Sequence, residues 1–176
     1  MMISDKMQAA LNDQVNKELY SEYLYFSMAA YFDSIGLKGF ANWMRCQMKE
    51  ERTHALIQYT YINDAGGRAQ MAPIAGPPVE FESVLNVYEE TLAHEKIVTA
   101  SINNLANLAI EEKDHATAAF LQWFITEQVE EEATAKEWAD QLRLVGNDGR
   151  GILMLDREAA TRVFTAPAAA VNVGPI

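Results

Sequence analysis

One polar pattern occurs twice in this chain, at a spacing of 77 residues, and each copy interrupts an otherwise apolar helical stripe. The first copy consists of Glu18, Glu51 and His54, and the second of Glu95, Gln128 and Glu131. Residues three apart, such as Glu51 and His54, lie one above the other on a helix. Because both copies have the same internal spacing, two helical hairpins would carry these groups at matching depths. The repeat therefore predicts two polar half-sites that face each other across one core.

Four long segments without proline carry apolar residues at alternating spacings of three and four. They span about residues 4–35, 37–65, 83–111 and 114–145. Ser4 can cap the first segment, and Gly36, Gly66 and Gly146 follow the ends of three of them. This pattern is typical of an antiparallel helical bundle.

The lengths of the connections set the predicted topology. The first and third links are a few residues long, so each joins an antiparallel hairpin. The middle link, residues 66–82, contains three prolines and spans roughly 56 Å at about 3.3 Å per residue. A helix of about 28 residues is roughly 42 Å long. The link is therefore long enough to cross the full length of the bundle, which makes the second and third helices parallel. The fold is therefore predicted to be all-α, an antiparallel four-helix bundle with one long crossover between helices two and three.

A short fifth helical segment is predicted at about residues 152–164. It is too short to be stable alone, so it must pack on the bundle or on another subunit. Residues 1–164 are therefore expected to form one domain, the four-helix bundle with its fifth helix. Residues 165–176 are expected to be a mobile tail.

Composition excludes several classes of protein. With 49% hydrophobic residues the chain is globular, and a net charge of −11 makes nucleic acid a poor partner. No uncharged stretch of membrane-spanning length is present, so neither a transmembrane helix nor a membrane partner is expected. The single cysteine, Cys46, and the absence of a signal-peptide pattern favour the cytoplasm.

Several carboxylates pointing into one core need counter-charge, because each isolated buried carboxylate costs several kcal/mol. No lysine or arginine occupies the neighbouring stripe positions. We therefore expect a pair of divalent cations to neutralise the buried carboxylates. Oxygen ligands with one imidazole suit iron, manganese or zinc more than copper. The half-sites are unequal: Glu18, Glu51 and His54 are expected to bind one ion more tightly. Glu51 and Glu95 would also serve the second ion, with Gln128 and Glu131 near it.

Other polar residues allow two interpretations. His54 alone would more often be a hydrogen-bonded core histidine, and Tyr25 is either a core tyrosine or a redox-active neighbour. Glu50, Glu127 and Glu130 form either a solvated acidic face or an auxiliary cation site.

At these residues the chain resembles the bacterial non-haem ferritins over about residues 4–164. The resemblance rests on Glu18 with Tyr25, on the sequence Glu51-Arg52-Thr53-His54, on Glu95, on the block 123–131 and on the segment 149–153. It implies ferroxidase activity, in which Fe(II) is oxidised with dioxygen or peroxide. It also implies storage of the Fe(III) mineral inside a hollow homo-oligomeric shell of 24 subunits.

The family's site, carried onto this chain, implies two irons per subunit. The first would lie on Glu18, Glu51 and His54, and the second on Glu51, Glu95 and Gln128 with Glu131 close by. A third iron site matches Glu50, Glu127, Glu130 and Glu131, and Tyr25 matches an electron-donating tyrosine. Haem is not expected, because Arg52 and Thr53 occupy the region where a related haem-binding family carries a methionine.

Three rival functions remain open at this point. One is a passive shell subunit without oxidation chemistry, and another is a peroxide-detoxifying di-iron oxidase with little storage role. The third is a twelve-subunit shell, whose iron sites lie between subunits rather than within one chain.

Overall fold

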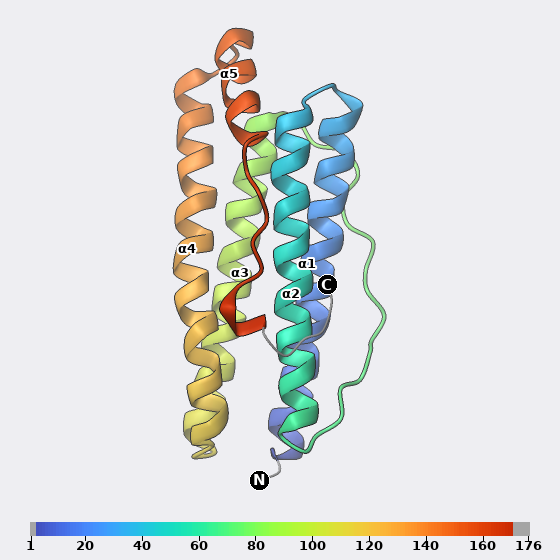
Figure 1. Cartoon of the computed structure of the whole chain (residues 1–176), viewed down its shortest axis with the longest axis vertical. Coiled ribbons are helices and arrows are strands. Elements are labelled where there is room, and N and C mark those ends of the chain that lie inside the picture. Colours follow the sequence, from blue (N-terminus) through green and yellow to red (C-terminus); the bar gives the residue numbers. More distant parts are fainter. Residues whose placement is uncertain (1–2, 171–176) are drawn as a thin grey trace.

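The structure, a computed structural model, describes residues 3–170, which contain five α-helices and one short 3-10 turn. Four of the helices lie side by side as a bundle, and the fifth sits at one end of it (Figure 1). The elements are α1 (Asp5–Ser34), α2 (Lys38–Asp64), α3 (Val84–Glu111), α4 (His115–Val145), α5 (Gly149–Ala159) and η1 (Ala168–Ala170). The predicted all-α bundle with a fifth helix is confirmed.

Local sequence signals set the ends of the long helices. The Ser4 hydroxyl caps α1 by accepting a hydrogen bond of 3.0 Å from the Met7 backbone N–H, a donor that has no partner inside the helix. Gly36 and Gly66, with φ of 81° and 82°, adopt the left-handed conformation that turns the chain after α1 and α2. Gly146 is the C-cap of α4. The predicted cap and stops are confirmed.

The long crossover runs along the bundle from the end of α2 to the start of α3 (Figure 1). The helices α2 and α3 therefore run parallel, whereas the α1–α2 and α3–α4 pairs are antiparallel hairpins. This is the predicted topology of a bundle with one long connection. Among residues 3–170, no helix is both long enough and apolar enough to cross a membrane.

The apolar core is divided into two clusters with a polar layer between them. One cluster, near α5, contains Phe32, Phe40, Tyr88 and Leu155, and the other contains Leu11, Ile62, Ile102 and Leu121. The polar residues lie at the boundary. On α1, Glu18 comes between Val15 of one cluster and Leu24 of the other, and on α2, Glu51 comes between Ala55 and Met44. The bundle thus holds its buried acids at mid-height, where apolar packing on both sides fixes the helices that carry them.

The fifth helix differs from its predicted bounds, since it spans Gly149–Ala159 rather than 152–164. It begins earlier because Asp148 caps it, accepting from the backbone N–H groups of Arg150 and Gly151 at 3.2 Å each. It ends earlier because the following chain is held against α2. The Asn42 side-chain amide donates to the carbonyl oxygens of Ala159 at 3.3 Å and Arg162 at 3.0 Å.

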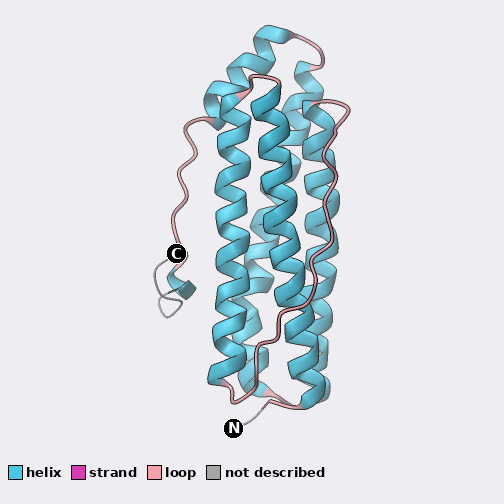
Figure 2. Cartoon of the chain, turned by 90° about the vertical axis from the view of Figure 1, so that its right-hand side faces the viewer, coloured by secondary structure: helices cyan, strands magenta, loops and turns pink. Residues whose placement is uncertain are grey.

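The segment after α5 descends along the bundle and ends in η1, which packs on α2. It lies on a different side of the bundle from the crossover (Figure 2). Residues 171–176 of the predicted mobile tail lie outside the described residues, and the mobility of the tail stays a prediction.

Candidate metal centre

All six residues of the repeated polar pattern are buried in the middle of the bundle. Their exposed fractions range from 1% to 7%, and they come from α1 (Glu18), α2 (Glu51, His54), α3 (Glu95) and α4 (Gln128, Glu131). Such burial is rare for carboxylates without a partner. The predicted convergence of all four helices on one interior layer is therefore what the structure shows.

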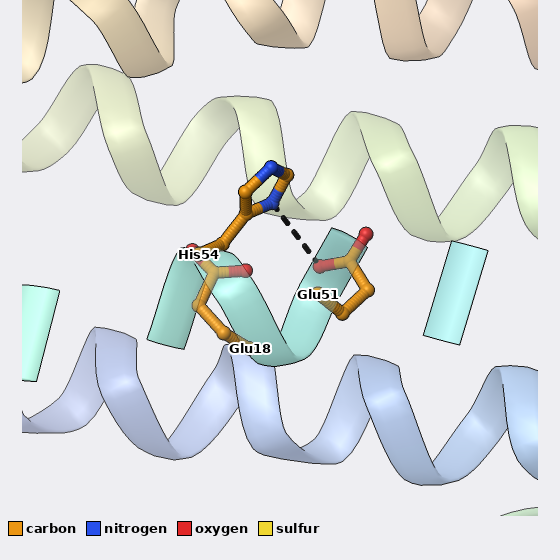
Figure 3. Close-up of side chains that lie close together, drawn as sticks. All are labelled: Glu18, Glu51 and His54. Carbon is orange, nitrogen blue, oxygen red and sulfur yellow. Dashed lines mark ion pairs between the residues drawn. The ribbon is translucent and has the colours of Figure 1, made fainter. Parts of the chain in front are cut away.

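The first half-site brings Glu18, Glu51 and His54 together. Each offers one ligand atom, and these atoms lie within 4.8 Å of one another, close enough to share one ion. The His54 Nδ1 atom lies 3.6 Å from Glu51 Oε2, and the Glu18 carboxylate approaches from α1 (Figure 3). Two carboxylates and one imidazole are a donor set that suits iron, manganese or zinc.

Two glutamines orient the Glu18 carboxylate. The side-chain amides of Gln14 and Gln58 both donate to Glu18 Oε1, at 3.0 and 2.9 Å. The other oxygen, Oε2, is buried and has no hydrogen-bond partner in the protein. A buried carboxylate oxygen without a donor is costly, and a cation there would satisfy it. Glu18 is therefore set to bind an ion through Oε2 while Oε1 stays fixed.

The second half-site is built around Glu95. The Tyr25 hydroxyl donates to Glu95 Oε1, and the Gln128 side-chain amide donates to Oε2 at 3.2 Å. In this arrangement Gln128 presents its N–H₂ group to the carboxylate. A cation binds an amide only through oxygen, so an ion held by Gln128 requires that amide to turn and break this hydrogen bond.

A second group of ligand atoms lies on the α2–α4 side of the layer. Atoms of His54, Glu127 and Glu131 lie within 4.8 Å of one another. Glu131 Oε2 also accepts a hydrogen bond of 2.6 Å from the Gln47 side-chain amide. His54 is thus a member of both groups.

Glu50 and Glu130, also predicted for the auxiliary site, join neither group among the described residues. Glu130 is exposed, and Glu50 is paired with Arg162 at 2.5 Å. The sequence reasoning missed Arg162, because nothing local links it to a residue 112 positions earlier. It also left Gln14, Gln47 and Gln58 without a role. Gln47 and Gln58 lie on the same helical stripe as Glu51 and His54, which is the signal that could have identified them.

Burial and mutual repulsion set the protonation of the acids. Burial raises the pKa of Glu51 and Glu131 well above the usual value, and the charge of Glu95 raises both further. Burial also raises the pKa of Glu95, against the lowering effect of its hydrogen bonds from Tyr25 and Gln128. The pKa of the Tyr25 hydroxyl is raised well above 10.0, first by burial and then by the Glu95 charge, so it remains a donor. Without a metal, this layer holds protons more readily than ordinary carboxylates do.

The surroundings of the layer are aromatic on one side and polar on another. The His54 ring meets Trp123 edge-on at a centroid distance of 5.5 Å and Phe124 at 6.0 Å. On α3, His94 Nε2 lies 2.7 Å from the Ser21 hydroxyl, and burial lowers the pKa of His94 to about 4. His94 is therefore neutral near pH 7 and adds no positive charge beside Glu95.

A four-helix bundle that holds carboxylates and a histidine on facing helices defines a class, the dinuclear carboxylate proteins. Comparison with known proteins identifies the family within that class. The ferritin-like domain matches residues 8–145. Bacterial non-heme ferritins are similar, from Staphylococcus epidermidis at 44% identity and from Staphylococcus aureus at 40%. Each match covers 93% of this chain and 98% of the relative.

Solved structures agree with this result. A closed form of the Archaeoglobus fulgidus ferritin, engineered by mutagenesis, is 50% identical with a TM-score of 0.92, covering 93% of this chain and 99% of that one. The open-pore ferritin of the same archaeon is 50% identical with a TM-score of 0.91, covering 92% and 99%. The chain belongs to the ferritin family. It is an iron-storage protein with ferroxidase activity, and it assembles with copies of itself.

Proposed function

We propose that each subunit oxidises two Fe(II) ions at the buried layer. The first ion binds Glu18, Glu51 and His54, and the second binds Glu51, Glu95 and Gln128, with Glu131 beside it. The observation that carries this proposal is the Glu18–Glu51–His54 group. Its ligand atoms lie within 4.8 Å of one another, and one Glu18 oxygen has no partner in the protein.

The electrons balance over a pair of ions. Two Fe(II) give up two electrons, which with two protons reduce dioxygen to hydrogen peroxide, or reduce hydrogen peroxide to two waters. Raised pKa values make the acids of the layer suitable for holding and releasing protons as ions enter and leave. Full reduction of dioxygen to two waters takes four electrons and four protons. With a third Fe(II) as the third electron donor, Tyr25 would supply the fourth electron and pass the proton of its hydroxyl to Glu95, to which that hydroxyl already donates.

The fate of the Fe(III) product, the size of the shell and a third iron site are proposed from the resemblance to the family. The Fe(III) product is stored inside a shell of 24 subunits in the cytoplasm. A third, weaker iron site involves Glu50, Glu127, Glu130 and Glu131, and no haem, nucleic acid or membrane takes part. Support for the third site comes from Glu127, which approaches Glu131 and His54. Glu50, by contrast, has a protein cation as its partner.

A double variant, E51A/H54A, tests the centre. Removing two of the three ligands that share the first ion should slow oxidation by at least about tenfold, because each ligand to a charged centre contributes well over 1 kcal/mol. Stopped-flow absorbance after aerobic Fe(II) addition measures the rate. The matched control is H115A/E137A, which removes an exposed histidine and an exposed glutamate. Oxidation at the wild-type rate in E51A/H54A would leave a passive shell subunit as the better description.

The same preparation separates storage from peroxide detoxification. Iron retained per particle after aerobic loading should be many times the number of ligand sites. Rates with dioxygen and with peroxide then show which oxidant the centre uses. A particle that oxidises Fe(II) rapidly with peroxide but retains little iron would be a detoxifying oxidase.

A further inference from the structure

The chain places an arginine from beyond α5 directly on the acidic group beside the metal centre. Arg162 Nη2 donates to Glu50 Oε2 at 2.5 Å, and Nη1 donates to Gln47 Oε1 at 2.8 Å. The guanidinium carbon also lies 4.3 Å from the centroid of the Trp43 ring. One planar group thus has a carboxylate, an amide and an aromatic face as partners, a combination that arginine supplies and lysine does not.

This contact is sheltered rather than a surface ion pair. The side chains of Arg162 and Glu50 are only 22% and 19% exposed. Surface pairs contribute little, but hydrogen-bonded pairs shielded from water are harder to separate. Glu50 consequently has a cation of the protein's own as its partner.

The backbone around Arg162 is held in place as well. Its carbonyl oxygen accepts a hydrogen bond of 3.0 Å from the Asn42 side-chain amide, and Cys46 Sγ lies 3.6 Å from the same oxygen. Both partners lie on α2, the helix that also carries Glu50, Gln47 and His54. The segment is therefore fastened at the position from which the guanidinium reaches the acids.

A second branch leads from Arg162 into the metal layer. Gln47 accepts from Arg162 through Oε1 and donates through Nε2 to Glu131 Oε2 at 2.6 Å. Because Arg162 can only donate, it fixes which end of the Gln47 amide faces Glu131. Glu131 is thereby oriented by a residue that does not touch the metal layer itself.

We propose that Arg162 is a positioning residue that occupies the third iron site in the metal-free protein and orients Glu131 through Gln47. A third ion that binds Glu50 must displace the Arg162 guanidinium. The segment after α5, which carries Arg162, must then move as well. The third site therefore fills last and weakly. This inference rests on the proposed function, since it concerns regulation of the same centre.

Zinc binding to the assembled, iron-free protein tests the proposal without any oxidation step. Isothermal titration calorimetry should show the third Zn(II) per subunit binding on the order of tenfold tighter in R162Q than in the wild type, because no cation has to leave Glu50. R162K keeps the charge but not the planar fork, so its third ion should bind with intermediate affinity. The matched control is R157Q, at an exposed arginine of α5, which should bind zinc as the wild type does.

Third-ion binding in R162Q that is unchanged, or weaker than in the wild type, overturns the proposal. If R162Q does not assemble, R162K decides: wild-type zinc binding by R162K then counts against the displacement. Failure of the proposed function looks different. In that case the wild type itself would bind no pair of Zn(II) ions and would not oxidise Fe(II), whatever happens at position 162.

Discussion

At the scale of single residues, the centre is a set of buried acids whose charge the metal-free protein does not balance. Glu51 illustrates this, since burial and the charges of Glu95 and Glu18 all raise its pKa well above 4.5. An acid with a raised folded-state pKa stabilises the fold below its unfolded pKa. That contribution is lost as the pH rises through the folded pKa. The contribution of Glu51 to the stability of the metal-free protein should therefore decrease as the pH rises above about 4.5, the ordinary pKa of this side chain.

E51Q tests this balance. In the iron-free protein it should melt a few degrees above the wild type at pH 8, because the buried charge is gone. For a chain of this size about 1 kcal/mol shifts the melting temperature by roughly 2–4 °C. The difference should shrink at pH 5 and reverse when Zn(II) is added, since E51Q lacks a ligand oxygen. Scanning calorimetry measures all three states, with the exposed E137Q as control. A variant that melts below the wild type at pH 8 without metal would show that Glu51 is not a source of strain.

The sequence predicted which polar residues meet inside the bundle where the signal was periodic, and it missed contacts where the signal was not periodic. Glu18, Glu51, His54 and Glu95 break apolar stripes at one repeated offset, and the structure buries all four in one layer. Arg162 had no such signal, because its contacts to Gln47 and Glu50 depend on how the chain turns after α5. The sequence also could not predict which group donates and which accepts in each hydrogen bond. Nothing in the sequence indicates that Gln128 donates to Glu95 rather than offering its oxygen to an ion.

At the scale of elements, the long helices were predictable because each has its own start and stop. Ser4 and Gly36 bound α1, and the proline-containing crossover separates α2 from α3. The fifth helix was placed too late because Gly149 and Gly151 resemble a loop, whereas Asp148 accepts the amides that let a helix begin there. The end of α5 depends on tertiary contacts with α2, and no signal in the local sequence predicts them.

The contact between α5 and the start of α2 is a close approach that depends on Gly39. A Cβ added at Gly39 would lie 1.6 Å from the Asp156 carbonyl oxygen of α5. The Asp156 side chain meanwhile accepts from the Phe40 backbone N–H at 2.9 Å, capping α2, whose N-cap residue Leu37 makes no side-chain cap bond. The two helices are therefore joined by a close approach and by a cap that belongs to the other helix.

G39A should separate α5 from α2 and lower stability by about 1–3 kcal/mol, the usual range for overpacking, or more if the cap is lost as well. The control is G76A in the crossover, where an added Cβ meets nothing within 4 Å. Calorimetry of both variants checks the difference. If G39A melts together with G76A and the wild type, the close approach does not hold α5 in place.

At the scale of the whole molecule, the chain uses its two extended segments on different sides of the bundle. The crossover joins the parallel helices on one side, and the segment after α5 follows α2 on another (Figure 2). That second segment carries Arg162, which is linked to Glu131 of the metal layer through Gln47. A bundle of four helices alone would hold the centre but would lack this link.

Assembly should depend on the face of α5 that the bundle leaves uncovered. Leu155 and Ala159 pack inward, whereas Leu153 and Met154 are 52% and 69% exposed on a helix too short to be stable alone. Exposed apolar side chains gathered on one element are typical of a contact surface, and this family assembles. L153R/M154R should therefore give smaller species in analytical ultracentrifugation while the helical circular dichroism stays unchanged, because the charges disturb only the subunit contact. I97R makes the same kind of change on α3, where Ile97 is 66% exposed, and should leave the shell intact. A full-sized shell from L153R/M154R would place the contacts that close the shell on other surfaces of the bundle.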